Sequence, residues 1–240
     1  MRYAVLGDIH GNLQALNAVL DDMKDLGVES ILCVGDVVGY GANPVECLQI
    51  MRERDVAIVA GNHDWAALGK VSVEYFNADA RDSMEWTCGQ LSRQDVDYLE
   101  SMPLVEMRDC ITLVHSNPFG PEYFDYIQTL YDVMLTFQHL ETPIAFVGHS
   151  HVPVMFSESD PLDCFLVPRH QMEPGVRMVV NVGSVGQPRD LDPRASYTVY
   201  DEDERIIHMR RVEYDIHGAA EAIRAAGLPS TNAARLELGR

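Results

Sequence analysis

A short unit recurs along the first two thirds of the chain. Each copy is an apolar run rich in β-branched residues, followed by glycine or directly by histidine, with a side chain that can bind a metal ion at its end. Runs of this length and composition predict buried β-strands. The copies cover residues 3–8, 31–36, 56–64, 111–115 and 144–149.

Helical patterns lie between these strands. Apolar residues spaced three to four apart predict a helix over residues 12–26, and Gly27 stands where a helix would stop. A shorter pattern predicts a helix over 44–54. Residues 65–102 are expected to be mostly helical, with Ser92-x-x-Asp95 as a capping box. Strands that alternate with helices imply a largely parallel sheet, whose strands border a ligand site at their carboxyl ends.

The last third of the chain has a different pattern. Tight turns separate its apolar runs, residues 201–204 are expected to form an acidic hairpin tip, and an Ala-rich helix is predicted over 216–226. The tail beyond that helix is expected to fray. The predicted strands are 165–167, 178–182, 197–200 and 206–209. We therefore expect two sheets packed together with helices outside, in one domain of residues 1–240 that carries a helical insertion at about 65–102.

Composition narrows the possible functions. Hydrophobic residues make up 47% of the chain, enough for a sizeable core, and no apolar run is long enough to span a membrane. The start of the chain has no signal-peptide pattern, so we expect a cytoplasmic protein. A formal charge of −19 argues against binding to nucleic acid or to an anionic membrane. The five widely spaced cysteines indicate neither a disulfide framework nor a thiolate zinc site.

The ligand-type side chains at the strand ends form one pattern. Asp8 and His10 are two residues apart, as are His149 and His151, so each pair points to the same side of an extended chain. Three further candidates, Asp36, Asn62 and His115, follow three other strands. Nitrogen and oxygen ligands without sulfur suit Mn, Fe, Zn, Ni or Co. Seven ligands are too many for one ordinary ion and suit two ions that share a bridging carboxylate.

Each motif alone has a simpler explanation. An Asp-x-His pair can be a surface histidine oriented by a carboxylate, His149 and His151 can be an incidental surface pair, and Asn12 and Asp64 can be helix N-caps. The simple explanation fails for the set, because it places seven ligand-type residues at the same end of five strands by accident.

The sequence resembles the calcineurin-like metallophosphoesterases, most closely their small bacterial and archaeal phosphodiesterases. Five motifs carry the resemblance in the family's order. They are Gly7-Asp-Ile-His-Gly-Asn12, Gly35-Asp36 with Gly41, Gly61-Asn-His-Asp64, His115 and Gly148-His-Ser-His151. The segment 181–189 resembles a glycine-rich strand end of the same group. The implied fold is a four-layer α/β/β/α sandwich of two packed mixed sheets.

The resemblance also implies roles for these residues. Two divalent transition-metal ions would be bound, with Mn as the first candidate and Fe, Zn, Ni or Co as the others. One ion would take Asp8, His10 and His151, the other would take Asn62, His115 and His149, and Asp36 would bridge them. A hydroxide between the ions would attack phosphorus in line. His63 would protonate the leaving oxygen as general acid.

Two positions depart from the protein phosphatases of this superfamily. Where those enzymes have an acidic residue and a phosphate-gripping arginine, this chain has Gly39 and Tyr40, which argues against a phosphoprotein substrate. Asp64 could orient His63 in place of the missing acid or could cap the helix that starts there. Arg189 could supply the missing guanidinium or could form a surface ion pair. Asn12 is the second candidate for substrate binding.

We therefore expect a metal-dependent hydrolase of small phosphomonoesters or phosphodiesters. The first alternative is a nucleotide pyrophosphohydrolase that acts on dinucleoside polyphosphates or cyclic nucleotides. The second is a non-catalytic scaffold of the same fold that binds protein partners. A scaffold would be expected to have lost His63 or several ligands, and this sequence keeps them all.

Overall fold

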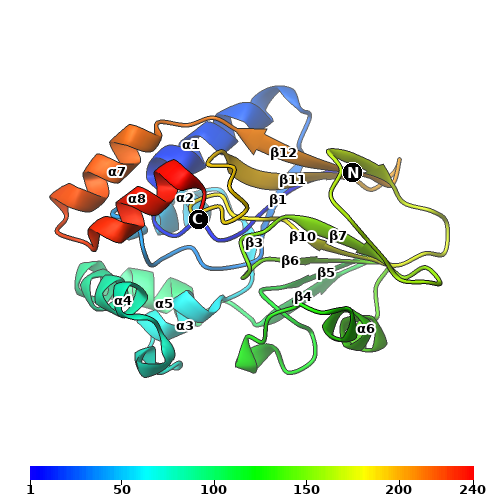
Figure 1. Cartoon of the computed structure of the whole chain (residues 1–240), viewed down its shortest axis with the longest axis horizontal. Coiled ribbons are helices and arrows are strands. Elements are labelled where there is room, and N and C mark those ends of the chain that lie inside the picture. Colours follow the sequence, from blue (N-terminus) through cyan, green and yellow to red (C-terminus); the bar gives the residue numbers. More distant parts are fainter.

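The computed structural model describes all 240 residues and contains two six-stranded sheets. We call them sheet A and sheet B, and they lie one above the other in Figure 1. Sheet A has the order β3 (Ala57–Ile58), β2 (Ser30–Cys33), β1 (Arg2–Leu6), β11 (Ala195–Asp201), β12 (Ile206–Val212) and β9 (Arg169–Gln171). Sheet B has the order β4 (Val105–Arg108), β5 (Ile111–Val114), β6 (Ile144–Val147), β10 (Met178–Asn181), β7 (Val154–Ser157) and β8 (Asp163–Phe165).

Both sheets are mixed. Strands β1, β2 and β3 are parallel neighbours in sheet A, and β5, β6 and β10 are parallel neighbours in sheet B. The remaining pairs, including the long β11–β12 hairpin, are antiparallel. The parallel strands predicted in the first two thirds of the chain are therefore present, and antiparallel strands from the last third complete each sheet.

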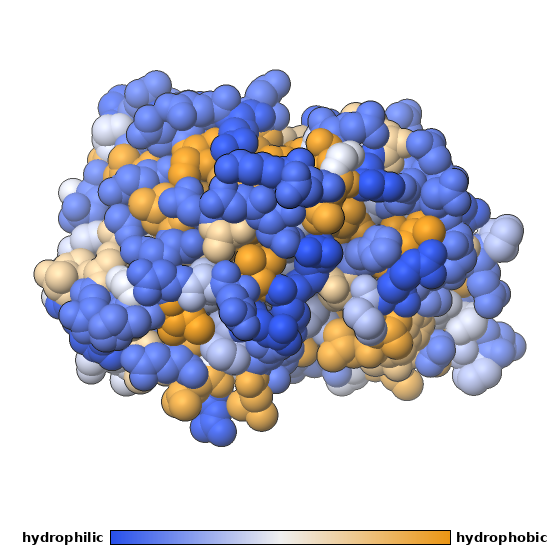
Figure 2. Space-filling model, turned by 90° about the horizontal axis from the view of Figure 1, so that it is seen from above, coloured by the Kyte–Doolittle hydropathy of each residue, from blue (hydrophilic) through white to orange (hydrophobic).

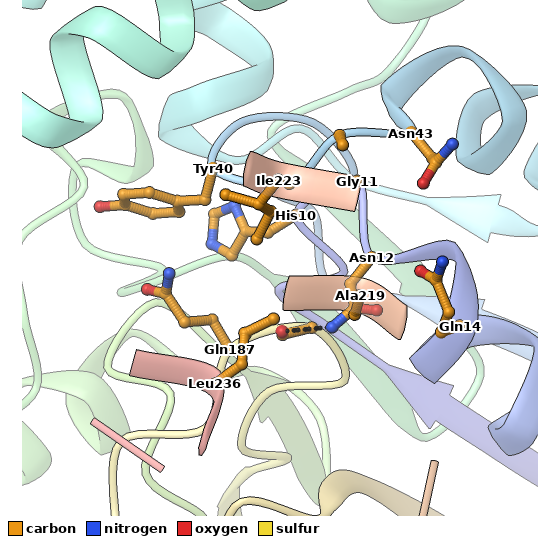
Figure 3. Close-up of a pocket in the computed structure, with 13 residues that line it drawn as sticks. His10, Gly11, Asn12, Gln14, Tyr40, Asn43, Gln187, Ala219, Ile223 and Leu236 are labelled. Atoms are coloured by element: carbon orange, nitrogen blue, oxygen red, sulfur yellow. Dashed lines mark hydrogen bonds between the residues drawn. The ribbon is translucent and has the colours of Figure 1, made fainter. Parts of the chain in front are cut away.

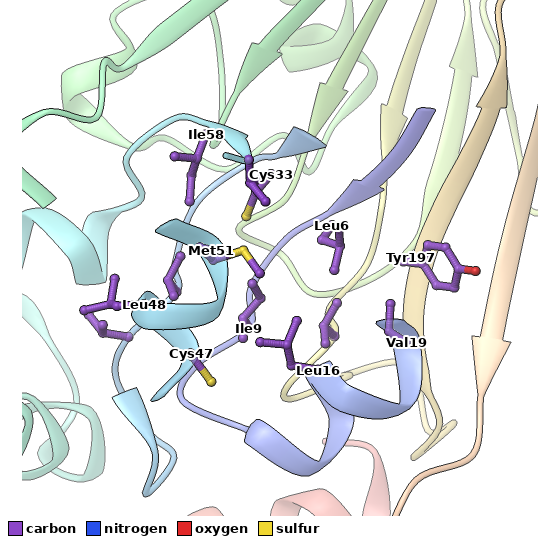
Figure 4. Close-up of a cluster of buried hydrophobic side chains, with 14 of the residues drawn as sticks. Leu6, Ile9, Leu16, Val19, Cys33, Cys47, Leu48, Met51, Ile58 and Tyr197 are labelled. Atoms are coloured by element: carbon purple, nitrogen blue, oxygen red, sulfur yellow. The ribbon is translucent and has the colours of Figure 1, made fainter. Parts of the chain in front are cut away.

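The main core between the sheets follows from the two-residue alternation of β1. Tyr3 and Val5 point toward sheet B and pack in a cluster with Phe146 and Val180. The alternate residues of β1 point to the other face of sheet A, where Leu6 packs in a larger cluster with residues of α1 and α2. Figure 4 shows this second cluster between the strands and the two helices.

Helices cover the outer faces of both sheets. Sheet A is covered by α1 (Leu13–Asp22) with its 3₁₀ extension η1 (Met23–Asp25), and by α2 (Pro44–Glu53). Sheet B is covered by α6 (Leu130–His139), whose Val133 and Phe137 pack on Val179 of β10. Four layers result, as Figure 1 shows, and the expected α/β/β/α sandwich is confirmed.

The helical stretch expected at 65–102 is present. It contains α3 (Asn62–Ala67), the 3₁₀ turn η2 (Val73–Tyr75), α4 (Ala78–Gln90) and α5 (Arg93–Glu100). The predicted capping box is confirmed at α5, because the Ser92 hydroxyl accepts from the Asp95 N–H and the Asp95 carboxylate accepts from the Ser92 N–H. A further 3₁₀ turn, η3 (Pro121–Tyr123), precedes α6.

The C-terminal tail corrects one expectation. It does not fray: α7 (Ile216–Ala225) is followed by α8 (Ser230–Leu238). The two helices bury Ile223 and Leu236 in a small cluster of their own, and the Asn232 amide donates to the Ser83 hydroxyl of α4 at 2.8 Å. Packing against the rest of the protein therefore orders a segment that was expected to fray because it lies at the end of the chain.

The structure also tests what the sequence indicated about membrane spans, the surface and the cysteines. None of the helices combines the length and apolar character needed to cross a membrane. Figure 2 shows a mainly hydrophilic face on which apolar residues occur in separate groups. All five cysteines are free, as expected from their spacing.

Candidate metal centre

The strand register brings the first two motifs together. The parallel pairing of β1 with β2 continues past the strand ends, because the Asp8 N–H donates to the Gly35 carbonyl and the His10 N–H to the Asp36 carbonyl, each at 2.9 Å. In sheet B the Gly148 N–H donates to the His115 carbonyl at 2.9 Å. The carboxyl ends of β1, β2, β5 and β6 thus meet at one edge, as the sequence predicted.

One group of possible ligands comes from the ends of β1 and β6. The Nε2 atoms of His10 and His151 are 3.1 Å apart, and Asp8 Oδ1 lies 3.3 Å from His151 Nε2. All three side chains are buried. Atoms this close can share one cation, and two imidazoles with a carboxylate suit a divalent transition metal.

A second group lies next to the first. His115 Nε2 is 3.2 Å from both Asn62 Oδ1 and His149 Nδ1. Asp36 stands between the two groups, because its Oδ2 is 3.6 Å from His10 Nε2 and 3.3 Å from His115 Nε2. The structure therefore brings together all seven residues that the sequence proposed as ligands, with one carboxylate in a bridging position.

Backbone carbonyls orient three of the imidazoles. The Nδ1 atoms of His10, His115 and His151 lie 3.0, 2.7 and 2.6 Å from the carbonyl oxygens of Val38, Val34 and Gln187. A carbonyl can only accept, so each Nδ1 carries a proton, and each Nε2 faces the cluster and offers a lone pair when the imidazole is neutral. This is the arrangement that metal-binding histidines usually have.

The backbone at the centre is strained. Five of the seven candidate ligands have left-handed φ angles, between 50° and 67°: Asp8, His10, Asp36, His149 and His151. Such angles are uncommon for residues other than glycine and cluster at functional sites. They turn consecutive loops back toward one point.

Glycines allow the loops to approach one another. A Cβ at Gly148 would lie 2.5 Å from Asp8 Oδ2, and one at Gly61 would collide with the Asp36 carboxylate. Without a Cβ, these two glycines let the backbone come close to the carboxylates of the centre.

Burial and neighbouring charges determine the protonation states of the four candidate ligand histidines. Burial lowers the pKa of His149 to about 3 and holds the pKa of His10 and His151 well below the usual range. Burial also acts to lower the pKa of His115, but the Asp36 carboxylate outweighs it and raises that pKa to about 9. Three imidazoles are therefore neutral at pH 7, whereas His115 must release a proton before it can bind a cation.

His63 lies at the edge of the cluster. Its backbone N–H donates to Asp36 Oδ1 at 2.8 Å, and its ring centroid is 4.8 Å from those of His10 and Phe76. Its Nδ1 lies 3.3 Å from the sulfur of Met84. The ring is buried, and burial lowers its pKa to about 4.

Asp64 contacts the backbone of the site. Its Oδ2 accepts from the N–H groups of Asp36 (2.8 Å) and Gly61 (3.0 Å), and its Oδ1 accepts from Val37 N–H at 3.0 Å. Of the two interpretations weighed from the sequence, these contacts match the helix cap, since Gly61 is the N-cap of α3. The same carboxylate also fixes the loop that carries Asp36.

The two candidate substrate-binding residues lie beside the cluster. Asn12 caps α1, because its Oδ1 accepts from Ala15 N–H, and its amide donates to the Gly186 carbonyl at 2.8 Å, the dashed line in Figure 3. The Arg189 guanidinium lies 5.6 Å from the Tyr40 ring centroid and donates to Gln187, while its buried Nε has no partner.

Sequence reasoning missed two aromatic neighbours. Tyr126 stacks on His149 with ring centroids 3.9 Å apart, and Phe76 packs on His63. No local pattern marks either residue, because the loops that carry them meet the histidines only in the folded chain.

The fold and the candidate metal centre place this chain among the α/β/β/α sandwich proteins that carry possible metal ligands at their strand ends. Residues 1–205 match the model of the calcineurin-like phosphoesterase superfamily domain. An uncharacterized protein from Methanocaldococcus jannaschii is 40% identical over 242 residues, which cover 99% of this chain and 98% of that protein. The chain belongs to the calcineurin-like phosphoesterase superfamily, and it is a phosphoesterase.

Two crystal structures extend this comparison. A metallophosphoesterase from Sphaerobacter thermophilus is 38% identical, with a TM-score of 0.90 over 100% of this chain and 99% of that chain. A hypothetical protein from Pyrococcus horikoshii OT3 is 20% identical, with a TM-score of 0.81 over 100% of this chain and 98% of that chain, and shares the fold.

Proposed function

We propose that this protein hydrolyses small phosphomonoesters or phosphodiesters with two divalent transition-metal ions. The observation that carries the proposal is the position of Asp36, whose one carboxylate oxygen lies near His10 of the first group and His115 of the second. Asp8, His10 and His151 would hold one ion, and Asn62, His115 and His149 the other. When bound, such a pair of ions supplies an attacking hydroxide and neutralises charge on the phosphoryl oxygens.

His63 would donate a proton to the leaving oxygen. Its ring is next to the cluster and beside an open cavity, so it can reach a leaving group that lies there. Burial keeps the free imidazole neutral at pH 7, with its pKa lowered to about 4. The negative charge of a bound phosphoester would raise that pKa and recruit the proton when the substrate is in place.

Three further residues would support the reaction. Arg189 has a buried Nε without a partner, which a phosphate oxygen would satisfy. Asp64 would position Asp36 through its bonds to the loop backbone, and Asn12 would hold the loop that carries His10. Manganese as the native metal belongs to this proposal, as does a cytoplasmic location, which the five free cysteines favour.

Metal analysis combined with a substrate panel tests the proposal. Metal-free protein would be reconstituted separately with Mn, Fe, Ni, Zn and Mg and assayed on matched phosphomonoesters and phosphodiesters. We expect two ions per chain and hydrolysis that depends on them. One ion per chain with full activity would contradict the two-metal arrangement. Two bound ions with no hydrolysis of any ester would favour the non-catalytic scaffold.

A further inference from the structure

An aromatic cavity opens beside the candidate metal centre. It has a volume of about 340 Å3, and Asn62, His63 and His149 form its inner end. Two segments that are distant in sequence supply its walls. Tyr75 and Phe76 come from the η2 region, and Tyr123, Phe124 and Tyr126 from the η3 region. The cavity therefore begins at the proposed general acid and continues between rings.

The rings differ in how firmly they are held. Phe76 and Tyr126 pack on the imidazoles of His63 and His149 at the inner end of the cavity, and Tyr126 is 44% exposed. Tyr75 and Tyr123 are instead 88% and 73% exposed, although both line the cavity. Large aromatic side chains normally bury much of their surface. These two rings keep most of their surface available to a ligand.

The backbone of the η3 region sets how the neighbouring rings of Tyr123 and Phe124 lie at the cavity. Phe124 has a left-handed φ of 53° and is buried, and Gly120, with φ 63°, lies under the Tyr123 ring. A Cβ at Gly120 would be 2.7 Å from Tyr123 Cδ2. A strained turn of this kind is kept where the surrounding structure holds it in place. It leaves both rings at the cavity, with Phe124 buried in its wall and Tyr123 exposed.

The cavity has no formal charge in its walls. None of its lining residues is Asp, Glu, Lys or Arg. The residues before the two exposed tyrosines, Glu74 and Glu122, are acidic and exposed. Such a cavity favours an uncharged group and offers no cation for a second phosphate. Arg189, the nearby guanidinium, lies over the ring of Tyr40, which lines the cavity, but Arg189 itself is not one of the lining residues.

We infer that this cavity binds an uncharged planar ring on the leaving side of the substrate, such as the base of a nucleoside phosphoester. The inference rests on the proposed function, because His63 would protonate an oxygen at the mouth of the cavity. Tyr75 and Tyr123 would stack on the ring and so determine specificity. Dinucleoside polyphosphates would be poor substrates, since their leaving group places phosphate where the walls carry no positive charge.

Matched substrates test this specificity. Adenosine 5′-monophosphate and its methyl diester would be compared with the corresponding esters of methyl riboside 5-phosphate, which lack the base. Phenyl phosphate would test for an aryl ester site, and a bis(adenosyl) tetraphosphate would test for a polyphosphate leaving group. We expect the base to raise kcat/KM by about 5- to 150-fold, the range equivalent to the stacking of one base on aromatic side chains. The adenosine diester should release adenosine and methyl phosphate rather than methanol. Because phenolate leaves more easily than an alkoxide, the two are compared by KM: a lower KM for phenyl phosphate than for the adenosine esters would assign the cavity to aryl esters and overturn the nucleoside assignment.

Variants of the two exposed tyrosines test whether the preference for esters with a base arises in this cavity. Tyr75→Ala and Tyr123→Ala should each raise KM for the adenosine esters by about tenfold and leave the esters without a base unchanged. Tyr75→Phe should keep the wild-type KM. Tyr131→Ala is the matched control, because Tyr131 is 66% exposed on α6 and does not line the cavity.

A binding measurement separates this inference from the proposed function. Saturation-transfer NMR of adenosine with the metal-free protein should show contact that Tyr75→Ala weakens and Tyr131→Ala does not. Such contact would support the ring site even if no phosphoester were hydrolysed. The inference would be overturned by equal kcat/KM with and without the base, by rapid hydrolysis of the tetraphosphate, or by adenosine contact that survives loss of both tyrosines.

Discussion

His63 stands apart from the ligands around it, and its proposed role can be tested by the leaving group. His63→Gln keeps much of the side-chain volume but cannot deliver a proton. We expect it to retain both metal ions, to lose little rate on a nitrophenyl ester, and to lose about 10²–10⁴-fold on an alkyl or nucleoside ester. Parallel kinetics on the two ester types measure this difference. Equal losses on both would show that His63 only donates a hydrogen bond.

Asp36 should be the residue on which metal content depends most. Asp36→Asn removes the shared charge while keeping a side chain that tolerates the left-handed backbone at this position, where φ is 55°. We expect metal per chain to fall from two toward zero by elemental analysis. Asn62→Ala, which removes a ligand of one group only, should leave about one ion. Unchanged metal content in Asp36→Asn would contradict the bridging role.

The residues of the centre differ in how far the sequence could predict them. The seven candidate ligands stand in short motifs at strand ends, so spacing alone placed them at one edge. The capping bond of Asp64 to Gly61 N–H was one of the two roles weighed from the sequence. Its bonds to the backbone N–H groups of Asp36 and Val37 could not be predicted, because they join two loops that are distant in the sequence. Tyr126 and Tyr75 carry no local signal for the same reason.

The end of α1 depends on one ionic contact with sheet A. Asp22 accepts two hydrogen bonds from the Arg210 guanidinium, at 2.7 and 2.8 Å, and one from the Tyr197 hydroxyl. The Arg210 bonds in particular hold the pKa of Asp22 below its usual value. A depressed folded pKa means stability that is present above the unfolded value, about 3.9, and is lost as pH falls through the folded one.

Asp22→Asn should therefore lower the free energy of unfolding at pH 7 by about 1–2 kcal/mol. The difference from wild type should begin to shrink as pH falls below about 3.9, and it should vanish only below the depressed folded pKa, where the wild-type carboxyl is protonated. Urea unfolding at several pH values measures this. Asp21→Asn is a neighbouring control, since Asp21 pairs with Lys24 on the exposed face and its loss should cost less than about 0.5 kcal/mol. A difference between Asp22→Asn and wild type that does not decrease at all as pH falls from 7 to 3 would rule out the ionic explanation.

At the scale of elements, success did not depend on length, because some four-residue strands were predicted and others were missed. The strands at 111–114 and 144–147 have the bounds that their apolar runs indicated. Strands β4, β7 and β9 were missed, as was α6. Strands β4 and β9 are rich in polar and charged residues, and β7 and β9 pair with β10 and β12, which come later in the chain. The strand expected over 56–60 shortens to 57–58, since the chain leaves the sheet to reach Gly61.

At the scale of the whole molecule, we propose that residues 1–240 unfold as one unit. The core between the sheets is shared, with Val5 of sheet A and Phe146 of sheet B in the same cluster. Calorimetry should show one transition. Saturating metal, at about 100 times its dissociation constant, should raise Tm by about 5–10 °C, and chelation should reverse this. Two separated transitions, with only one of them sensitive to metal, would instead indicate two independent domains.

The left-handed backbone of the centre has a consequence for how such a site can change over generations. Apart from glycine, the residue types that tolerate this conformation best are Asn, Asp and His. The five strained positions are occupied by Asp and His, which are also the residue types that bind the ions. The left-handed backbone and the proposed binding of metal ions thus favour the same few residue types. In a lineage that abandoned catalysis, the backbone would still favour Asn, Asp, His or Gly at these positions, so that few changes would be needed to restore each ligand.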